Sequence, residues 1–460
     1  MDKLVALLLA AGEGKRMKSK KPKVLHKIMG KALLEWVCES VLEAGIRDCV
    51  GVVGHKSEEV EKYMGNRLKY FYQKEQLGTG HAVMQTIDYI KDNSDYVLIL
   101  CGDTPLIKSD TLNKAIDKVK NKDFGALIIT TTVNNPKGYG RIIRDNNQNV
   151  LKIVEEKDAN ENEKSINEIN SGMYCFKTDY LIEVLRNLDN NNSQSEYYLT
   201  DTIEMLLKKD IKVGALKINE SNEIMGINDR KQLSIATQII KEDILSHHME
   251  NGVTIIDPKT TFIDKDVKIG IDTTIMPGSI IQGNTIIGED SIIGPNANIT
   301  STEIGDFTKI NNSTIVESKI GNFSNVGPYA YIRPKSVVGN NVKIGDFVEI
   351  KATVIGDKTK ISHLTYVGDA QIGKNVNIGC GVVVVNYDGK KKNKTIVGDN
   401  AFIGCNTNLV SPVEVKSNSY IAAGSTITKE VPENSLAIAR SKQTIIDGWV
   451  KRKGMSRGID

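Results

Sequence analysis

A six-residue repeat fills the second half of the chain, and it constrains the fold more than any other feature of the sequence. Ile-Gly or Val-Gly pairs recur there, with glycines six residues apart at 288/294, 321/327, 339/345, 373/379 and 398/404. This period is typical of a parallel β-helix, in which each unit forms one short strand and one turn. The aliphatic residue then points into the prism, and glycine permits the tight corner. Because three units make one coil, residues 253–437 predict roughly ten coils.

One segment does not follow the repeat. Residues 386–395, with the sequence NYDGKKKNKT, are polar and too numerous for a corner. We therefore expect this segment to protrude from the prism. Loops that leave a rigid scaffold often carry function, so the segment is a candidate part of a site.

The first half of the chain has a different composition. Leucine occurs 25 times in residues 1–250 and three times in residues 251–460, whereas glycine rises from 16 to 23. Leucine favours helices, and Ile and Val favour strands. Apolar runs and helical spacings alternate in the first half. They predict strands over residues 3–10, 49–53, 96–101 and 126–133 and helices over residues 32–43, 81–90 and 111–119. Such alternation indicates an α/β unit with a mostly parallel sheet covered on both faces, whose active site lies at the carboxyl ends of the strands.

A long helix is expected between the two halves. Residues 229–250 carry an apolar stripe, and Asn251-Gly252 then breaks the helical pattern. We expect this helix to be an arm that joins two domains. The predicted organisation is therefore a first domain over residues 1–228, a helical arm over 229–250, and a β-helix domain with a C-terminal tail over 251–460.

Charge and composition exclude several classes of protein. The 60 basic and 57 acidic residues give a net charge of +3, which argues against a dedicated nucleic-acid binder. No stretch approaches the roughly 18 to 20 apolar residues of a membrane span. The apolar N-terminus lacks a basic flank and a cleavage site, so it predicts a buried strand rather than a signal peptide. The six cysteines are scattered and form no C-x-x-C pair, which favours reduced thiols in a cytoplasmic protein.

The segment LAAGEGKRM, residues 9–17, follows the first predicted strand. Its small residues would let phosphate groups approach the backbone N–H groups, and Arg16 and Lys23 could neutralise the phosphate charge. The segment is neither a Walker loop nor a dinucleotide-binding fingerprint. A plain glycine-rich turn is the alternative, and the two nearby cations favour a phosphate site.

Asp103 follows the predicted strand over residues 96–101. A carboxylate at the carboxyl end of a strand points into the active-site crevice. Hard oxygen ligands suit Mg²⁺, which also takes phosphate oxygens and water. The alternative is an aspartate that caps a helix or a turn.

Polar residues interrupt the repeat of the second half, although composition alone does not separate a catalytic β-helix from a trimerising or regulatory one. Arg333 and Lys351 are 18 residues apart, which places them on one face about one coil apart. Two stacked cations would make a phosphate site, whereas a solvated face is the alternative. The interrupting residues are Arg333, Glu349, Lys351, His363, Tyr366, Asn377, Asn386 and Tyr387.

An ordered set of motifs carries a family resemblance. LAAGEGKRM followed by PK, then EQLGTGHA, CGD, GYGRI, IVEEKDA, INSGMY and GIND, occur in the order seen in sugar-nucleotide pyrophosphorylases. Together with the repeat, the chain resembles the family of bifunctional bacterial UDP-N-acetylglucosamine pyrophosphorylases and glucosamine-1-phosphate N-acetyltransferases over roughly residues 4–445. The resemblance implies a Rossmann-like nucleotidyltransferase domain and a left-handed parallel β-helix of hexapeptide repeats. It also implies homotrimers whose acetyltransferase sites draw on neighbouring subunits.

The resemblance implies roles in the first domain. UTP and Mg²⁺ would bind there, and the oxygen of N-acetylglucosamine-1-phosphate would attack the α-phosphorus in line and release pyrophosphate. Lys15 and Cys101 stand where the family commonly has Thr and Tyr, and neither side chain is needed for this chemistry. The implied residues are Leu9, Ala10, Ala11, Gly12, Gly14, Arg16 and Lys23 for the phosphates, Gln73, Gly78 and Thr79 for uracil, Gly140, Glu155, Asn170 and Asn228 for the sugar, and Asp103 and Asn228 for Mg²⁺.

The resemblance also implies an acetyltransferase site in the second half. His363 would be its general base, and Glu349 would orient or polarise that histidine. Cys405 stands where the family usually has Ser, and a thiol is a weaker hydrogen-bond donor. The implied ligands of glucosamine-1-phosphate are Arg333, Lys351, Tyr366 and Asn377, and those of acetyl-CoA are Cys380, Asn386, Tyr387, Cys405, Ala423 and Arg440.

These observations predict a cytoplasmic bifunctional enzyme with small-molecule substrates and no nucleic-acid or membrane partner. Its second domain would make N-acetylglucosamine-1-phosphate, and its first domain would convert that product to UDP-N-acetylglucosamine, a cell-wall precursor. One alternative is a nucleotidyltransferase whose β-helix has only a regulatory or trimerising role. The other is a non-catalytic scaffold. His363 and its polar neighbours argue against the first alternative, and Arg16, Lys23, Asp103 and Asn228 argue against the second.

Overall fold

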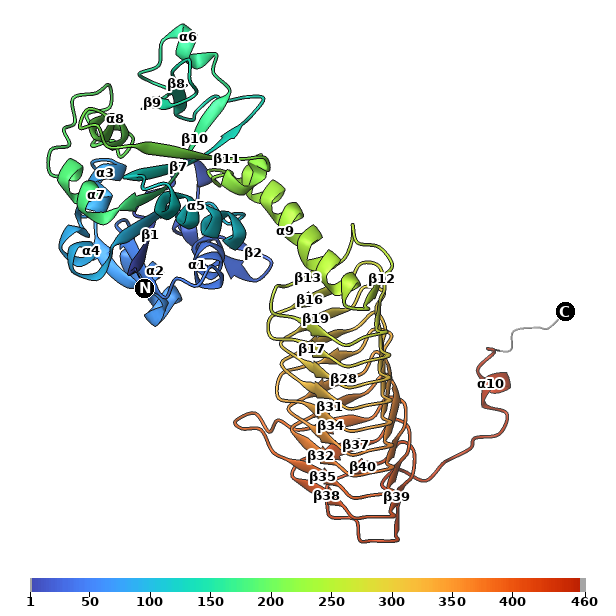
Figure 1. Cartoon of the computed structure of the whole chain (residues 1–460). Coiled ribbons are helices and arrows are strands. Elements are labelled where there is room, and N and C mark those ends of the chain that lie inside the picture. Colours follow the sequence, from blue (N-terminus) through green and yellow to red (C-terminus); the bar gives the residue numbers. More distant parts are fainter. Residues whose placement is uncertain (1, 456–460) are drawn as a thin grey trace. The chain divides into compact units, whose positions relative to one another are not determined.

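The computed structural model describes residues 2–455. Its chain divides into two compact units between Lys241 and Glu242. The helix predicted over residues 229–250 is present as α9 (Arg230–Glu250), and the division between the units falls inside it rather than at its ends. Figure 1 shows the elements of both units.

A largely parallel sheet forms the centre of the first unit, as the alternating pattern predicts. Its order is β11-β7-β10-β6-β1-β4-β5, and only β10 in this path runs antiparallel to its neighbours. A hairpin, β8 (Arg141–Arg144) with β9 (Val150–Val154), extends from β10. Because β1 lies beside β6 in parallel, the carboxyl ends of these two strands meet, and Leu9 pairs with Cys101. The strands are β1 (Leu4–Ala10), β4 (Asp48–Val53), β5 (Lys69–Tyr72), β6 (Tyr96–Cys101), β7 (Ala126–Thr132), β10 (Glu168–Lys177) and β11 (Val213–Ile218).

Helices bury both faces of this sheet. One apolar cluster includes side chains of α1 (Leu33–Glu43), α2 (Ser57–Met64) and α5 (Ser109–Asn121). The cluster on the other face includes α3 (Thr79–Met84), α4 (Ile87–Asn93), α7 (Thr178–Leu185) and α8 (Asp201–Leu207). The prediction of a single helix over residues 81–90 is therefore wrong, because this segment belongs to two helices, α3 and α4. Thr86 separates them, since its hydroxyl donates to the Val83 carbonyl at 2.8 Å and competes with the helical hydrogen bonds.

The second unit is a parallel β-helix with three sheets. The sheets contain 11, 10 and 9 strands from β12 (Thr254–Ile255) to β41 (Leu436–Ala437), which confirms the prediction of about ten coils. Most strands bury one aliphatic side chain in the prism, and in one sheet these residues are Ile263, Ile281, Ile299, Ile315, Ile332, Ile350, Val367, Val384, Leu409 and Ile427. Between β34 (Val383–Val385) and β35 (Thr395–Val397), the polar segment leaves the prism as expected (Figure 1).

In most Ile-Gly and Val-Gly pairs the glycine has a different task from the one that the sequence predicts, whereas Gly294 and Gly327 do have positive φ values of 100° and 104°. Gly305, Gly321 and Gly356 are not among the residues with positive φ. Instead, a Cβ on Gly321 would lie 2.6 Å from the backbone of Gly339 in the next coil. Glycine is needed there because the coils approach closely. The left-handed corner conformation belongs to residues two positions later, such as Phe323 with φ 56°.

Candidate functional site

The candidate phosphate loop follows β1 in the first unit. Residues 10–14 connect the strand to two short 3₁₀ helices, η1 (Lys15–Met17) and η2 (Lys23–Leu25). Gly14 has φ 65°, and a Cβ there would lie 2.6 Å from the Cβ of Lys23. Glycine therefore lets the Lys23 side chain lie against the loop. Gln76 also holds this loop, because its Nε2 donates to the Ala11 carbonyl at 2.8 Å.

Lys23 connects this loop with the two predicted metal ligands. The Gly102 backbone N–H donates to the Leu9 carbonyl at 2.9 Å, which places Asp103 beside the loop. Lys23 Nζ forms an ion pair with Asp103 Oδ2 and lies 3.2 Å from Asn228 Oδ1. The structure therefore brings these three predicted residues together. Arg16 is exposed on η1.

The oxygens of Asp103 and Asn228 suit a hard divalent cation. Both oxygens contact one cationic group, the Lys23 ammonium. Among residues 2–455, no cluster of three or more His, Cys, Asp or Glu side chains could hold a metal ion. A Mg²⁺ ion would therefore take its remaining ligands from phosphate oxygens and water, as Mg²⁺ does in phosphoryl-transfer sites.

The residues expected to contact uracil lie at the start of α3. Gln73 is buried, and its Nε2 donates to the Gly78 carbonyl at 2.9 Å. Gly78 has φ 106°, a conformation that favours glycine. The Thr79 hydroxyl accepts from the Leu199 N–H at 3.2 Å. A cavity of about 520 Å³ adjoins this region, and its lining includes Glu13, Gln73 and Gln76.

Three of the four residues expected to contact the sugar also meet. A Cβ on Gly140 would lie 3.5 Å from both the Asn170 Cβ and the Glu155 Oε1. The Asn170 N–H donates to the Gly140 carbonyl at 2.9 Å. Burial raises the pKa of Glu155, and a hydrogen bond from the Thr200 hydroxyl at 3.2 Å opposes that effect.

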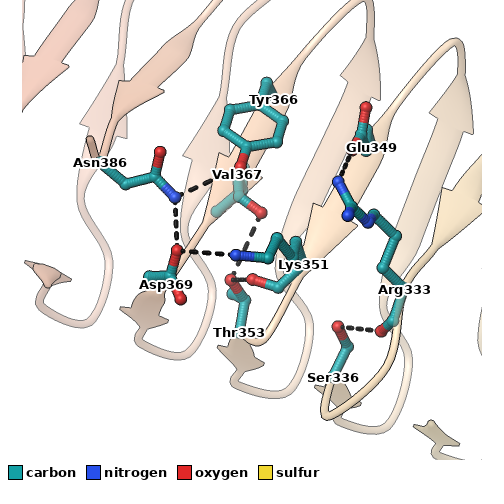
Figure 2. A network of polar contacts seen from close by, with 9 residues as sticks. All are labelled: Arg333, Ser336, Glu349, Lys351, Thr353, Tyr366, Val367, Asp369 and Asn386. Atoms are coloured by element: carbon teal, nitrogen blue, oxygen red, sulfur yellow. Dashed lines mark hydrogen bonds and ion pairs between the residues drawn. The ribbon is translucent and has the colours of Figure 1, made fainter. Parts of the chain in front are cut away.

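A polar network follows one sheet of the β-helix (Figure 2). As the 18-residue spacing predicts, Arg333 and Lys351 lie in neighbouring coils, because β25 (Tyr331–Ile332) pairs in parallel with β28 (Glu349–Lys351). Arg333 Nη1 donates to Glu349 Oε1 at 2.7 Å. Lys351 Nζ donates to Asp369 Oδ2 at 3.3 Å.

Asn386, the residue at which the protruding segment begins, completes this network. Its Nδ2 contacts Asp369 Oδ2 at 2.5 Å and Tyr366 Oη at 3.2 Å. The sequence interpretation missed Asp369, although it lies 18 residues, or one coil, after Lys351. Tyr366 lies on β31 (Tyr366–Gly368), and the segment thus connects to the same face as the two stacked cations (Figure 2).

The carboxylate at the His363 ring is not the predicted one. His363 Nδ1 lies 2.5 Å from Asp346 Oδ1, whereas Glu349 accepts from Arg333. The reason is the register: β27 (Lys343–Asp346) and β30 (Lys360–His363) are adjacent, and Asp346 pairs with His363. The sequence spacing of 17 residues could have indicated Asp346. Among the residues that the structure describes, no hydrogen bond joins His363 to Glu349.

Asp346 determines which ring nitrogen of His363 is free. The hydrogen bond with His363 is the main cause that holds the pKa of Asp346 below its ordinary value. An ionised carboxylate only accepts hydrogen bonds, so Nδ1 must carry the proton that it donates. In the neutral ring, Nε2 then has the lone pair. The side chain of His363 is 56% exposed, so a substrate can reach it.

The residues expected to bind acetyl-CoA mostly follow one corner of the prism. The Asn406 N–H donates to the Cys380 carbonyl at 2.7 Å, and the Gly424 N–H donates to the Cys405 carbonyl at 2.8 Å. Cys380, Cys405 and Ala423 therefore lie in successive coils on the C-terminal side of the coil that carries His363.

The other three predicted residues lie on different elements of the second unit. Asn377 lies on β33 (Asn377–Ile378), in the same sheet as His363. Tyr387 is exposed on the protruding segment, and Arg440 is exposed after the last strand. No hydrogen bond between side chains ties either Tyr387 or Arg440 to His363 among residues 2–455.

Within the described part of the chain, no helix is both long and apolar enough to cross a membrane.

Comparison with known families matches both units. The nucleotidyl transferase family profile matches residues 5–221. The bacterial transferase hexapeptide profile matches residues 266–301 and 394–429, and the profile of the GMPPB C-terminal domain matches residues 318–400. The matched repeats and the three parallel sheets together correspond to the predicted left-handed β-helix.

Three relatives that match over nearly their full length carry the same description. The bifunctional protein GlmU of Acetivibrio thermocellus is 63% identical over 457 residues, which cover 99% of each chain. The proteins of the same name from Clostridioides difficile and Clostridium kluyveri are 55% and 54% identical, and the alignments cover at least 97% of each chain. At this identity and coverage, the chain belongs to the GlmU family of bifunctional enzymes.

Proposed function

We propose that the two units catalyse successive steps in the synthesis of UDP-N-acetylglucosamine, a cell-wall precursor made in the cytoplasm. The first unit transfers UMP from UTP to N-acetylglucosamine-1-phosphate. The second unit supplies that acceptor by acetylating glucosamine-1-phosphate with acetyl-CoA. The observation that carries the first assignment is the convergence of Lys23, Asp103 and Asn228 at the carboxyl ends of adjacent strands.

In the first unit, the chain positions the phosphates and neutralises their charge. Lys23 and Arg16 provide cations beside the loop of residues 10–14, whose N–H groups face the phosphates. Bound Mg²⁺, held by Asp103 and Asn228, would neutralise charge on the phosphate oxygens. Lys23 would contact a phosphate group when the nucleotide is bound. The acceptor oxygen attacks the α-phosphorus, the bond to the β-phosphate oxygen breaks, and pyrophosphate leaves.

In the second unit, His363 Nε2 accepts a proton from the 2-amino group of the substrate. The nitrogen lone pair attacks the thioester carbonyl carbon, the carbon–sulfur bond breaks, and CoA leaves as a thiolate. Asp346 stabilises the imidazolium that forms. Arg333 and Lys351 would hold the phosphate, and Glu349 and Asp369 keep these two cations in place.

The homotrimer is part of this proposal. Tyr329, Phe347 and Leu364 are 59%, 58% and 58% exposed at one corner of successive coils. The rings of Tyr329 and Phe347 stack at 5.5 Å. Leu364 directly follows His363, so a second copy that covers this apolar corner would also enclose the acetyltransferase site. Contiguous exposed apolar side chains of this kind mark contact surfaces.

We expect Asp346→Asn to lower the kcat of acetyl transfer on the order of 10²-fold. Replacing the buried carboxylate of the Ser–His–Asp triad costs about 10⁴-fold, and the smaller effect is expected here because water can reach this half-exposed pair. Steady-state kinetics with glucosamine-1-phosphate and acetyl-CoA would measure the change. Glu349→Gln should instead raise the KM for glucosamine-1-phosphate, because Glu349 contacts Arg333. Equal kcat losses in both variants would contradict these separate roles.

A fragment of residues 1–241 should fold and retain uridylyl transfer, because the first unit has its own sheet and apolar clusters. A shorter fragment of residues 1–229 should be less active. It lacks Gln232, whose Oε1 accepts from the Asn228 N–H at 2.7 Å. Sedimentation and a pyrophosphate-release assay would test both fragments. A trimeric 1–241 fragment would refute the assembly surface on the β-helix.

Assays of the two half-reactions on the full chain test the proposed function. One uses UTP, Mg²⁺ and N-acetylglucosamine-1-phosphate, and the other uses acetyl-CoA and glucosamine-1-phosphate. Activity in both is expected. Uridylyl transfer without acetyl transfer would support the alternative in which the β-helix has only a regulatory or trimerising role.

A further inference from the structure

Two segments distant in sequence meet at the candidate metal site, and they share a second contact. The first contact joins Lys23 Nζ to Asn228 Oδ1 at 3.2 Å. The second joins Arg230 Nη1 to His26 Nδ1 at 3.3 Å. His26 follows Lys23 by three residues, and Arg230 follows Asn228 by two. The second contact involves no substrate group, so it can hold the segments together before substrate binds.

His26 is fixed at its end of this contact. The residue is 7% exposed. Its N–H donates to the Lys23 carbonyl at 3.1 Å, and its carbonyl accepts from the Leu33 N–H at 3.0 Å. The backbone of His26 is therefore fixed to the 3₁₀ helix that carries Lys23, and its side chain is buried.

The hydrogen-bond chemistry of His26 indicates that Nδ1 is its useful atom. A guanidinium group only donates, so Nδ1 must accept from Arg230, and in the neutral ring Nε2 carries the hydrogen. Nε2 is buried and has no hydrogen-bond partner among residues 2–455. A buried donor without a partner destabilises the folded state, and a leucine would avoid that cost. A histidine at this position is therefore explained by the contact with Arg230.

Arg230 is fixed to Asn228 at the other end. It is the first residue of α9. The Asp229 carboxylate accepts from the N–H groups of Lys231 and Gln232 at 2.9 Å, and Gln232 Oε1 accepts from the Asn228 N–H at 2.7 Å. Asn228 and the first turn of α9 thus form one hydrogen-bonded piece.

We propose that His26 and Arg230 are positioning residues that hold the Asn228 segment against the phosphate loop, so that Asn228 and Asp103 face one divalent cation. Neither residue touches the reacting atoms. The proposal rests on the proposed metal-binding role of Asn228. The pair acts by joining two pieces that are each rigid, and its loss lets Asn228 move away from Asp103.

The first test is Arg230→Ala in the full-length chain, with Lys231→Ala as the matched control. Both substitutions remove one exposed cation from the first turn of α9, but only Arg230 contacts His26. Calorimetric titration with Mn²⁺ in the presence of UTP should show about tenfold weaker binding for Arg230→Ala, within the range for residues that orient metal ligands. The kcat of uridylyl transfer should fall by a similar factor, whereas acetyl transfer and the Lys231→Ala variant should be unchanged.

The second test separates the acceptor from the shape of the ring. His26→Asn places an amide oxygen near the position of Nδ1 and should keep Mn²⁺ binding close to that of the wild type. His26→Leu removes the acceptor and should match Arg230→Ala. The double variant should be no worse than Arg230→Ala alone, because residues that act through one contact are not additive. If His26→Leu does not fold, Arg230→Ala and His26→Asn still decide the question.

Several results would overturn the proposal. They are wild-type Mn²⁺ binding in Arg230→Ala, equal losses in Arg230→Ala and Lys231→Ala, or fully additive losses in the double variant. Asn228→Ala separates the metal-binding role of Asn228 from the positioning role of His26 and Arg230. If Asn228→Ala binds Mn²⁺ as the wild type does, the proposed metal-binding role of Asn228 is at fault.

Discussion

Asp103→Asn should lower uridylyl transfer by more than tenfold while acetyl transfer continues at the wild-type rate. The substitution preserves the size of the side chain and removes the single carboxylate at the end of β6. Asn228 supplies only a neutral oxygen, so the cation would lose the one formal negative charge that the chain provides. Loss of a metal ligand commonly costs more than a decade in activity, since even outer residues cost 10- to 100-fold. Pyrophosphate release at saturating Mg²⁺ measures the effect.

Asp110→Asn is a suitable control for this substitution. Asp110 lies in the first turn of α5, its side chain is 73% exposed, and it contacts only Lys114 among the ion pairs of the described chain. It should leave both activities unchanged. Retention of more than about a tenth of uridylyl transfer by Asp103→Asn would show that Asp103 is not the metal ligand.

His363→Ala should have the largest effect on the other reaction. General-base catalysis typically contributes 10² to 10⁴-fold, and the kcat of acetyl transfer should fall by about that factor. The KM for acetyl-CoA should change only a few-fold, because the imidazole acts on the amine of the other substrate. Uridylyl transfer should be unaffected.

The pH dependence of kcat provides the decisive comparison. A general base must be unprotonated to accept a proton. The wild-type kcat should therefore decrease as the pH falls, and His363→Ala should lack that acidic limb. If the two enzymes have identical pH profiles and similar kcat values, His363 is only a binding or structural residue. Cys405→Ser, which restores a better hydrogen-bond donor, should be mild or favourable and serves as the control in the same corner.

Periodic features of the fold could be predicted from the sequence. The Ile-Gly spacing predicted the number of coils, and the 18-residue separation of Arg333 and Lys351 placed them in neighbouring coils. The apolar run before Cys101 predicted β6, and the strand-end position of Asp103 brought it to the phosphate loop. In each case a short period or a chain direction determines position, and both are visible in a linear sequence.

Contacts that depend on register or on side-chain competition were harder to predict. Glu349 was expected beside His363 because it is a carboxylate about one coil away, but the pairing of β27 with β30 brings Asp346 there instead. The break at Thr86 depends on one hydroxyl bond to the Val83 carbonyl. The antiparallel direction of β10 follows from long-range pairing that no local pattern encodes. The contact between Arg230 and His26 joins residues 204 positions apart, and neither motif by itself indicates the other.

Because the coils approach closely at the Ile-Gly pairs, equivalent positions in successive coils of the β-helix lie at a constant distance from one another. From Cys380 to Cys405 the chain runs 25 residues, including the protruding segment, yet the Asn406 N–H still bonds the Cys380 carbonyl at 2.7 Å. From His363 to Cys380 it runs only 17 residues. The distance between equivalent positions in successive coils is the strand spacing of about 4.8 Å, and it does not depend on the number of residues between those positions. Insertions at a corner can therefore lengthen a loop without moving the strands on either side of it, whereas a one-residue insertion within a strand would turn its outward side chains inward.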